Sequence, residues 1–185
     1  MPEQKKFLKL ELPIIEQEIE LLAANEEELA GRTVKMDLTR KLRGKSLEAI
    51  FKIKIFDKKI KAELYRLHLL SYFITRIMRK SVNYVEDSFS SECKNAVLKI
   101  KPFLITRKKV SRVIRKALRN KAKEEIQTEI KDKSYEDVFS DILEGRFQKS
   151  LSLKLKKIYP LAFCEIRDIF VEQEKENIVV EEKIE

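Results

Sequence analysis

The densest cluster of charged side chains lies between residues 107 and 123, where seventeen residues contain nine cations and no acid. The cations are Arg107, Lys108, Lys109, Arg112, Arg115, Lys116, Arg119, Lys121 and Lys123. Lysine and arginine neutralise the phosphates of nucleic acids, and these contacts supply much of the binding affinity. A solvated helix surface is the alternative interpretation, but such surfaces usually mix charges of both signs. The lack of acids therefore favours contact with phosphate groups.

Two smaller basic groups add to this cluster. One surrounds Gly44, in a turn predicted between two strands, and contains Arg40, Lys41, Arg43 and Lys45. The other belongs to a short predicted helix and contains Arg76, Arg79 and Lys80. Basic loops are common, so neither group alone indicates a function. Together with residues 107–123 they predict a surface built from several elements, which suits RNA recognised by its shape and backbone.

Four aromatic residues could add base stacking to these phosphate contacts: Tyr65, Tyr72, Tyr84 and Phe89. Aromatic side chains form stacking platforms in many proteins that bind single-stranded nucleic acid. However, aromatic residues on strands belong to the core more often than to a binding surface. The sequence alone therefore favours packing for these four residues and leaves stacking as the alternative.

No residue pattern predicts catalysis, a metal site or a cofactor. The chain has no P-loop, dinucleotide fingerprint or Gly-x-Ser-x-Gly motif. His68 is the only histidine, and its predicted place in a strand favours a structural role. Cys93 and Cys164 have no Cys or His nearby, so we expect two buried thiols rather than a zinc site. Acid pairs such as Glu124 and Glu125 are typical of solvated helix surfaces, and we expect no small-molecule substrate.

Length and charge limit the function classes. The chain has 185 residues and a formal net charge of +9, which indicates one domain with a polyanionic partner. The positive excess lies in the middle, with +8 over residues 32–73 and +12 over residues 74–123, while both ends are acidic. No apolar run approaches the ~18 residues of a membrane span, and the N-terminus lacks a targeting segment. We therefore expect a cytoplasmic protein without a membrane partner.

Alternating apolar and polar residues predict a β-sheet in the first half of the chain. β-branched and aromatic residues are enriched in five runs, at about 32–39, 46–56, 60–69, 82–90 and 96–105. Residues 14–22 also alternate, although a helical period fits them nearly as well, and residues 161–171 predict a last strand that returns to the sheet. Strands of this length and spacing predict an antiparallel sheet or a partly closed barrel.

A helical period of 3.6 begins after Thr106 and predicts a helix that runs to about residue 127. Its predicted apolar stripe consists of Val110, Val113, Ile114, Ala117 and Leu118. We expect this stripe to be buried against the sheet, so that the cations of residues 107–123 face outward. A charged residue at Val113 should then destabilise the fold.

Three further helices are predicted from caps and periodicity. Ser71 can cap a short helix that ends before Arg79, and Ser134 with Asp137 predicts a capping box for a helix that ends near Gly145. A last helix over about 146–158 should bury a set of apolar residues: Phe147, Leu151, Leu155 and Ile158.

Several motifs, in consistent order over about residues 5–172, resemble one known family. The earlier ones are Gly31-Arg32-x-Val34, His68 before the helix at Ser71, and Ile114-Arg115-Lys116. The most specific ones are Gly145-Arg146-Phe147, Lys157-Ile158-Tyr159-Pro160-Leu161 and Glu165-Ile166. Together they resemble the archaeal and eukaryotic small-subunit ribosomal proteins of the S-three-a-e family, also called eS-one. The compact size resembles the archaeal members.

The resemblance implies a position on the platform of the small ribosomal subunit, near the mRNA exit. The implied partners are small-subunit rRNA and neighbouring ribosomal proteins, and the sequence leaves open whether mRNA is contacted. The implied fold is a β-barrel joined to helices, in agreement with the periodicity. Alternatives to a ribosomal protein are a free RNA-binding chaperone or translation factor and, less favoured, an RNA-processing enzyme.

We therefore expect an α+β protein with an antiparallel, partly closed β-barrel and three to four helices, mostly in the C-terminal half. The barrel should comprise residues of about 14–106 and 161–171, and the helical part residues of about 107–158. Residues 1–172 should form a single rRNA-binding domain, followed by an acidic C-terminal tail at 173–185.

Overall fold

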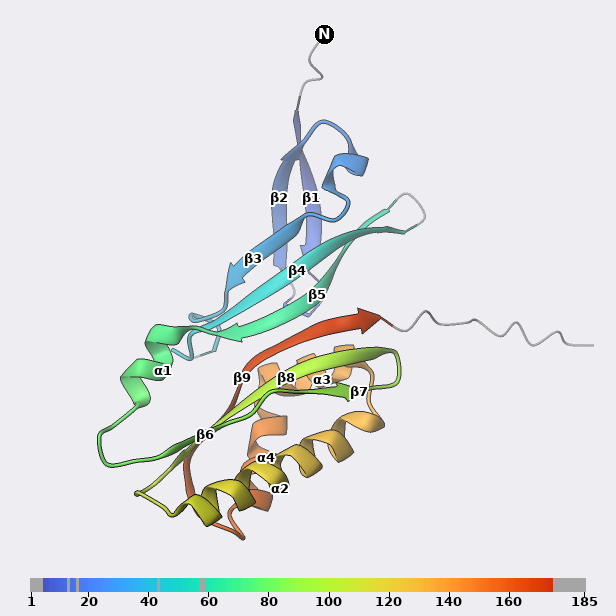
Figure 1. Cartoon of the computed structure of the whole chain (residues 1–185). Coiled ribbons are helices and arrows are strands. Elements are labelled where there is room, and N and C mark those ends of the chain that lie inside the picture. Colours follow the sequence, from blue (N-terminus) through green and yellow to red (C-terminus); the bar gives the residue numbers. More distant parts are fainter. Residues whose placement is uncertain (1–4, 13, 16, 43, 57–58, 175–185) are drawn as a thin grey trace, which may run out of the picture. The chain divides into compact units, whose positions relative to one another are not determined.

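A computed structural model describes residues 5–12, 14–15, 17–42, 44–56 and 59–174 of the chain (Figure 1). The fold is mixed α+β, with antiparallel sheets and four α-helices in this part of the chain, as the sequence predicts. The chain divides into two compact units, Met1–Arg79 and Lys80–Glu185. Most of the acidic tail, residues 175–185, lies outside the described residues.

The first unit begins with an antiparallel hairpin of β1 (Lys6–Leu12) and β2 (Gln17–Ala23). β2 confirms the strand that the alternation at 14–22 predicts, but β1 is absent from the sequence predictions. Its signal was available, because Leu8, Leu10 and Leu12 alternate with charged residues, and Leu10 and Leu12 are buried. A short 3-10 helix, Glu26–Leu29, follows the hairpin.

Three antiparallel strands complete the sheet structure of this unit: β3 (Thr33–Asp37), β4 (Leu47–Phe56) and β5 (Lys59–Leu69). On β4 the side chains of Leu47, Ala49, Phe51 and Ile53 are buried, which confirms the predicted alternation. Gly31 takes a left-handed backbone with φ 76° and donates its N–H to the carbonyl of Ile53, so the turn into β3 is fixed on β4.

Helix α1 (Ser71–Ile77) confirms the predicted short helix but not its cap. The N-cap is Leu70, and no side chain caps this end, so Ser71 is already the first helical residue. Phe73 is the buried residue of the helix. Arg76 places its guanidinium over the Phe73 ring, 5.2 Å from the ring centroid.

The second unit is organised by the long strand β8 (Ala96–Thr106). One edge of β8 pairs with β9 (Leu161–Glu174), which confirms the predicted return of the chain. β8 also pairs with two short strands, β6 (Tyr84–Glu86) and β7 (Phe89–Glu92). The predicted single strand at 82–90 is therefore divided, and Asp87, whose carboxylate accepts the N–H of Ser88, lies at the break.

A barrel is not found in the described part of the chain. Closing a sheet requires its two outer strands to pair. In the first unit, β3 pairs with β4 and has no second strand partner among the described residues. In the second unit the strand order is β9-β8-β6, with β7 also on β8. Alternation reports which side of a strand is buried, and this information does not distinguish an open sheet from a closed one.

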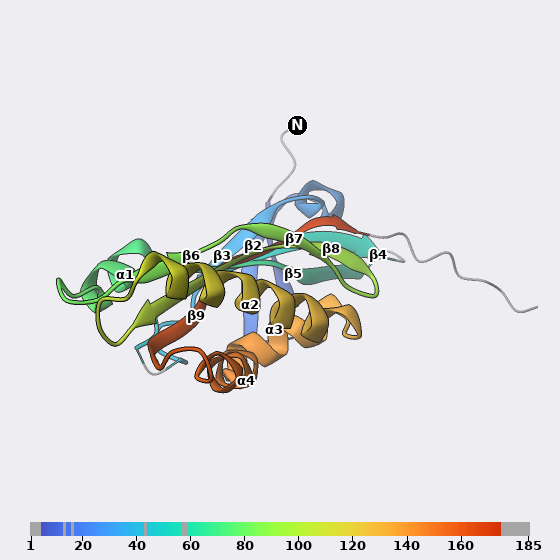
Figure 2. The same ribbon diagram turned by 60° about the horizontal axis from the view of Figure 1, so that its bottom comes forward.

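Three helices of the second unit lie on one side of β8 and β9 (Figure 2): α2 (Arg112–Lys131), α3 (Tyr135–Glu144) and α4 (Arg146–Leu155). Ser134 and Asp137 form the predicted capping box of α3. Gly145 ends α3 in the left-handed conformation and begins α4. α4 buries Phe147, Leu151 and Leu155 as predicted, but it ends before Ile158, which is 38% exposed.

The predicted apolar stripe of α2 is wrong in its position. The buried residues are Leu118, Ala122, Ile126 and Ile130, which repeat every four residues. Val113 is instead 77% exposed, because the helix begins at Arg112 and its first turn lies outside the packed part. Ala117 is also exposed, and Ile114 is half-buried. Only Leu118 of the predicted stripe is fully buried.

This geometry reverses the effect expected for a charge at Val113. Val113→Asp should change the free energy of unfolding by less than about 0.5 kcal/mol, because the site is exposed and the first turn of a helix favours an acid. Ile126→Asp should cost about 3 kcal/mol or more, because it buries an unpaired carboxylate. Urea unfolding of both variants measures the difference. Equal losses of stability would contradict the placement of the stripe.

Ion pairs connect α2 to α4. The carboxylate of Glu125 lies 3.0 Å from the ammonium of Lys121 on its own helix and 3.0 Å from that of Lys154 on α4. Lys154 also reaches Glu129, at 3.5 Å. Hydrogen bonds from Lys154 and then Lys121 lower the pKa of Glu125 below its ordinary value of 4.5. The pair therefore favours the ionised carboxylate in the folded state.

This shift predicts a specific acid sensitivity. A lowered pKa contributes stability that is complete above the ordinary value of 4.5 and is lost as the pH falls through the lower folded pKa. Glu125→Gln removes this contribution, so the variant should lose less stability than the wild type between pH 5 and about pH 3. Urea unfolding at several pH values tests this. Parallel pH profiles for the two proteins would show that Glu125 is not stabilised by its partners.

Candidate nucleic-acid interface

The first half of α2 and the segment before it carry seven cations that form no ion pair with any described residue. They are Arg107, Lys108, Lys109, Arg112, Arg115, Lys116 and Arg119, and we call them the α2 cation cluster. Six of them are exposed, and Arg115 is half-buried. Their charges are therefore available to a ligand.

The segment before α2 is held in place by side chains that sequence analysis did not select. Asn83 accepts the backbone N–H of Val110 with its side-chain oxygen at 2.8 Å. The Thr106 hydroxyl lies 2.7 Å from the carbonyl oxygen of Lys108 and 2.9 Å from that of Asn83. Ser111 caps the helix by accepting the N–H of Ile114. These bonds fix the backbone from which Arg107, Lys108 and Lys109 project.

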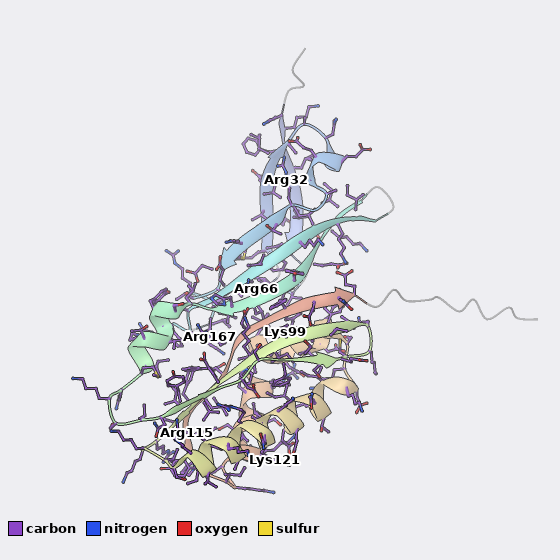
Figure 3. All side chains as sticks on the ribbon, in the orientation of Figure 1. Arg32, Arg66, Lys99, Arg115, Lys121 and Arg167 are labelled. Atoms are coloured by element: carbon purple, nitrogen blue, oxygen red, sulfur yellow. The ribbon has the colours of Figure 1, made fainter. Side chains whose placement is uncertain are left out.

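The rest of the predicted basic cluster has a different environment. Figure 3 labels Arg115 in the first part of α2 and Lys121 further along the same helix. Lys121 pairs with Glu124 at 3.3 Å and Glu125 at 3.0 Å, and these hydrogen bonds raise its pKa. Lys123 is exposed, with its ammonium 5.7 Å from the centroid of the Phe89 ring. The α2 cation cluster therefore ends at Arg119, although the basic sequence continues to Lys123.

A groove opens between β6 and α2. It has a volume of about 380 Å³ and is lined by one strand residue and five helix residues: Tyr84, Arg112, Arg115, Lys116, Arg119 and Asn120. The four cations of this set belong to the α2 cation cluster. The Nε atom of Arg115 is buried and has no hydrogen-bond partner in the described part of the chain. The groove thus combines concentrated positive charge with an unused donor.

Tyr84 is positioned by other aromatic rings. Its ring stacks on Phe103 with a centroid distance of 6.0 Å and an interplanar angle of 27°. Phe103 is in turn held edge-on by Phe163, at 6.5 Å. The other predicted stacking residues differ: Phe89 is buried at 6% exposure, which contradicts a stacking role for it. Tyr65 is half-buried with the Lys52 ammonium over its ring, whereas Tyr72 is exposed.

The two smaller basic groups lie mostly in the first unit. Arg40 and Lys41 are exposed in the turn before β4, and Lys41 donates to the carbonyl of Ile15 at 2.6 Å. Lys45 is half-buried in this turn, and Arg43 lies outside the described residues. The other group, on and after α1, is exposed and consists of Arg76, Arg79 and Lys80. Within the second unit, the structure brings together the cations at the start of α2.

No metal site is found within the residues that the structure describes. They contain no group of three or more His, Cys, Asp or Glu side chains that could hold a metal ion. Cys93 and Cys164 are buried free thiols, and the Cys93 thiol contacts the carbonyl of Ala96 at 2.9 Å. His68 is half-buried on β5, opposite Glu48. None of the helices in the described ranges is long and apolar enough to cross a membrane.

Comparison with known proteins agrees with the motifs in the sequence. The profile of the Ribosomal S3Ae family matches residues 3–175. The small ribosomal subunit protein eS1 of Nanoarchaeum equitans is 28% identical over 185 residues, which cover 96% of this chain and 93% of that protein. The protein of the same name from Halorubrum lacusprofundi is 24% identical, over 98% of this chain and 88% of the relative. The chain therefore belongs to the Ribosomal S3Ae family.

Proposed function

We propose that this protein is a structural component of the small ribosomal subunit and binds small-subunit rRNA through the α2 cation cluster. The observation that carries the proposal is the set of seven cations that have no acid partner among the described residues. Unpaired cations on a fixed backbone are suited to phosphate contacts, which position a protein on RNA. The sequence relatives of this chain are named small ribosomal subunit proteins, and a structural role agrees with that name.

The mechanism is electrostatic. Arg112 and Lys116, like Arg115 and Arg119, are spaced four residues apart on the helix, and like charges at this spacing repel each other. RNA phosphates placed between them replace this repulsion with attraction and release condensed counterions. Because β6, β7 and α4 hold α2 in place, the cations can order an RNA segment instead of moving with it.

The finer location is part of the same proposal. We place the protein on the platform of the small subunit, near the mRNA exit, in contact with neighbouring ribosomal proteins and in the cytoplasm. Residues 1–172 then act together as one rRNA-binding domain. Its additional RNA contacts come from Arg40, Lys41, Arg43 and Lys45 and from Arg76, Arg79 and Lys80. The resemblance of the sequence motifs to the S3Ae family supports this location.

A charge-matched comparison tests the RNA surface. In the test variant, Arg112, Arg115 and Arg119 are changed together to Gln. In the control variant, three exposed cations on and after α4 are changed to Gln: Lys149, Lys156 and Lys157. If wild type neutralises ~6 phosphates, its affinity should fall on the order of a thousandfold between 50 and 200 mM salt. The arginine variant should lose about three contacts and fall only about fortyfold over this range. Filter binding to rRNA fragments measures both.

The control variant should keep the salt dependence of the wild type, since its cations lie outside the proposed surface. The melting temperature of the arginine variant should stay equal or rise slightly, because the like-charge repulsion is relieved. Equal loss of RNA affinity in both variants would show an effect of net charge alone. That result would contradict the assignment of the surface to α2.

A ribosomal component should also remain with the subunit. After a moderate salt wash, the protein should sediment with small subunits in about one-to-one amount, and the arginine variant should be depleted from them. A free chaperone or translation factor would instead appear in the soluble fraction at the same salt concentration. Sucrose-gradient sedimentation with quantitative immunoblotting measures this ratio.

A further inference from the structure

We propose that the groove between β6 and α2 binds one unpaired nucleotide of RNA, with the base stacked on Tyr84 and the adjoining phosphates held by the arginines of α2. This inference rests on the proposed function and names the kind of RNA that the site takes. It predicts that a single-stranded or extruded nucleotide is recognised here, whereas the remaining α2 cation cluster contacts only the backbone.

Tyr84 has the properties of a stacking platform. Its side chain is 49% exposed although the ring stacks on Phe103, so one face is covered and much of the ring remains open. The contact of Phe103 with Phe163 fixes the ring plane from behind. The neighbouring residue Val85 is buried in the unit, which ties the strand to its core. A ring held in this way loses little freedom when a base stacks on it.

The charged side of the groove is placed to bind the phosphates of the same nucleotide. Arg112, Arg115, Lys116 and Arg119 occupy positions i, i+3, i+4 and i+7, so they follow one face of the helix. The Nε of Arg115 is buried without a hydrogen-bond acceptor among the described residues. Buried donors are normally paired. A phosphate oxygen in the groove would supply the missing acceptor.

The size of the groove and its remaining polar group fit a nucleotide. A volume of about 380 Å³ is at the small end of ligand sites, which suits one nucleotide but not a double helix. Asn120 contributes an amide that has no partner in the described part of the chain, and an amide can both donate to and accept from a base edge. In duplex RNA the bases are stacked in the helix and cannot reach Tyr84.

The alternative use of this groove is contact with the backbone of a duplex, in which Tyr84 has no role. The affinity of the full-length protein for two RNA probes of equal length separates the two cases. One probe is an oligouridine single strand, and the other is a fully paired RNA duplex. Tyr84→Leu keeps an apolar side chain against Phe103 but removes the ring. The affinity of Tyr84→Leu for oligouridine should be about tenfold lower than that of wild type, whereas its affinity for the duplex should be unchanged. Tyr84→Phe is the matched control and should bind both probes like wild type.

A spectroscopic reporter makes the stacking visible. The chain contains no tryptophan, so Tyr84→Trp introduces a single indole fluorophore into the groove. Its fluorescence should be quenched when oligouridine binds and should change little with the duplex. Melting temperatures close to that of wild type ensure that each variant is folded. If Tyr84→Leu melts well below wild type, the test rests on Tyr84→Trp, because the indole keeps the aromatic contact with Phe103.

The outcomes distinguish this inference from the proposed function. If Tyr84→Leu binds oligouridine like wild type, or if both probes weaken equally in a folded variant, stacking in the groove is wrong. Absence of quenching on a bound single strand would overturn it as well. If instead the variant with Arg112, Arg115 and Arg119 changed to Gln binds both probes like wild type, the RNA surface itself is misassigned and the proposed function loses its support.

Discussion

Burial of one apolar stripe on α2 determines how the cations of this helix are arranged. Leu118, Ala122, Ile126 and Ile130 are nearly inaccessible to solvent, and burial of each large side chain contributes about 1.5–3 kcal/mol. The rotation of the helix about its axis is therefore fixed. With 3.6 residues per turn, Arg115 lies about 60° from the Leu118 direction and Arg119 about 100°. The half-burial of Arg115 follows directly from this angle.

The same rotation explains why β6 and the arginines share a groove. α2 packs on β6, β7 and α4 within the second unit, so one flank of the helix faces the short strand that carries Tyr84. Arg112, at about 120° from the Leu118 direction, lies on that flank, whereas Val113 and Ala117 are on the opposite one. Packing of the second half of the helix thus sets the direction of the charges on its first half. Sequence alone identifies the charges but not the flank.

Along α2 the cations change their role at Lys121. Before this residue they have no acid partner in the described part of the chain, whereas Lys121 pairs with Glu124 and Glu125. Lys154 of α4 joins the same carboxylates and helps hold the two helices together. A continuous basic sequence therefore contains cations without an acid partner among the described residues and a cation, Lys121, that takes part in intramolecular pairing. Net charge per segment cannot separate them.

Local signals predict several features that depend on a single element. The capping box of Ser134 and Asp137, the αL Gly145 and the alternation of β4 all follow from residues close in sequence. The predicted apolar stripe of α2 is misplaced because Val110, Val113 and Ile114 have a helical period, although Val113 is exposed and the other two are only half-buried. The division between β6 and β7 depends on their pairing with β8, and the closure of a barrel depends on all strands at once.

The candidate site shows the same limit. Residue type and density identified Arg112, Arg115 and Arg119, but Asn120 has a role only because it lines the groove that Tyr84 closes from another element. Among four aromatic candidates, exposure separates Tyr72 and Tyr84 from Tyr65 and Phe89, and exposure is a tertiary property. The proposed phosphate contacts therefore follow from composition, whereas the proposed preference for an unpaired nucleotide depends on which aromatic ring the fold leaves open.

Through the α2 cation cluster, dissolved salt has opposite effects on the stability of the helix and on the proposed RNA binding. In the free protein, repulsion between Arg112 and Lys116 and between Arg115 and Arg119 opposes helix formation by a few tenths of a kcal/mol for each pair. Dissolved salt screens this repulsion and therefore favours the free fold. The same salt weakens the attraction of these side chains for phosphate, because the release of each condensed counterion into a more concentrated salt solution gains less entropy. Salt thus relieves the repulsion on this helix in the free protein and weakens the proposed contacts of the same side chains with phosphate. The buried stripe allows this, because it holds α2 in place without any contribution from the charges.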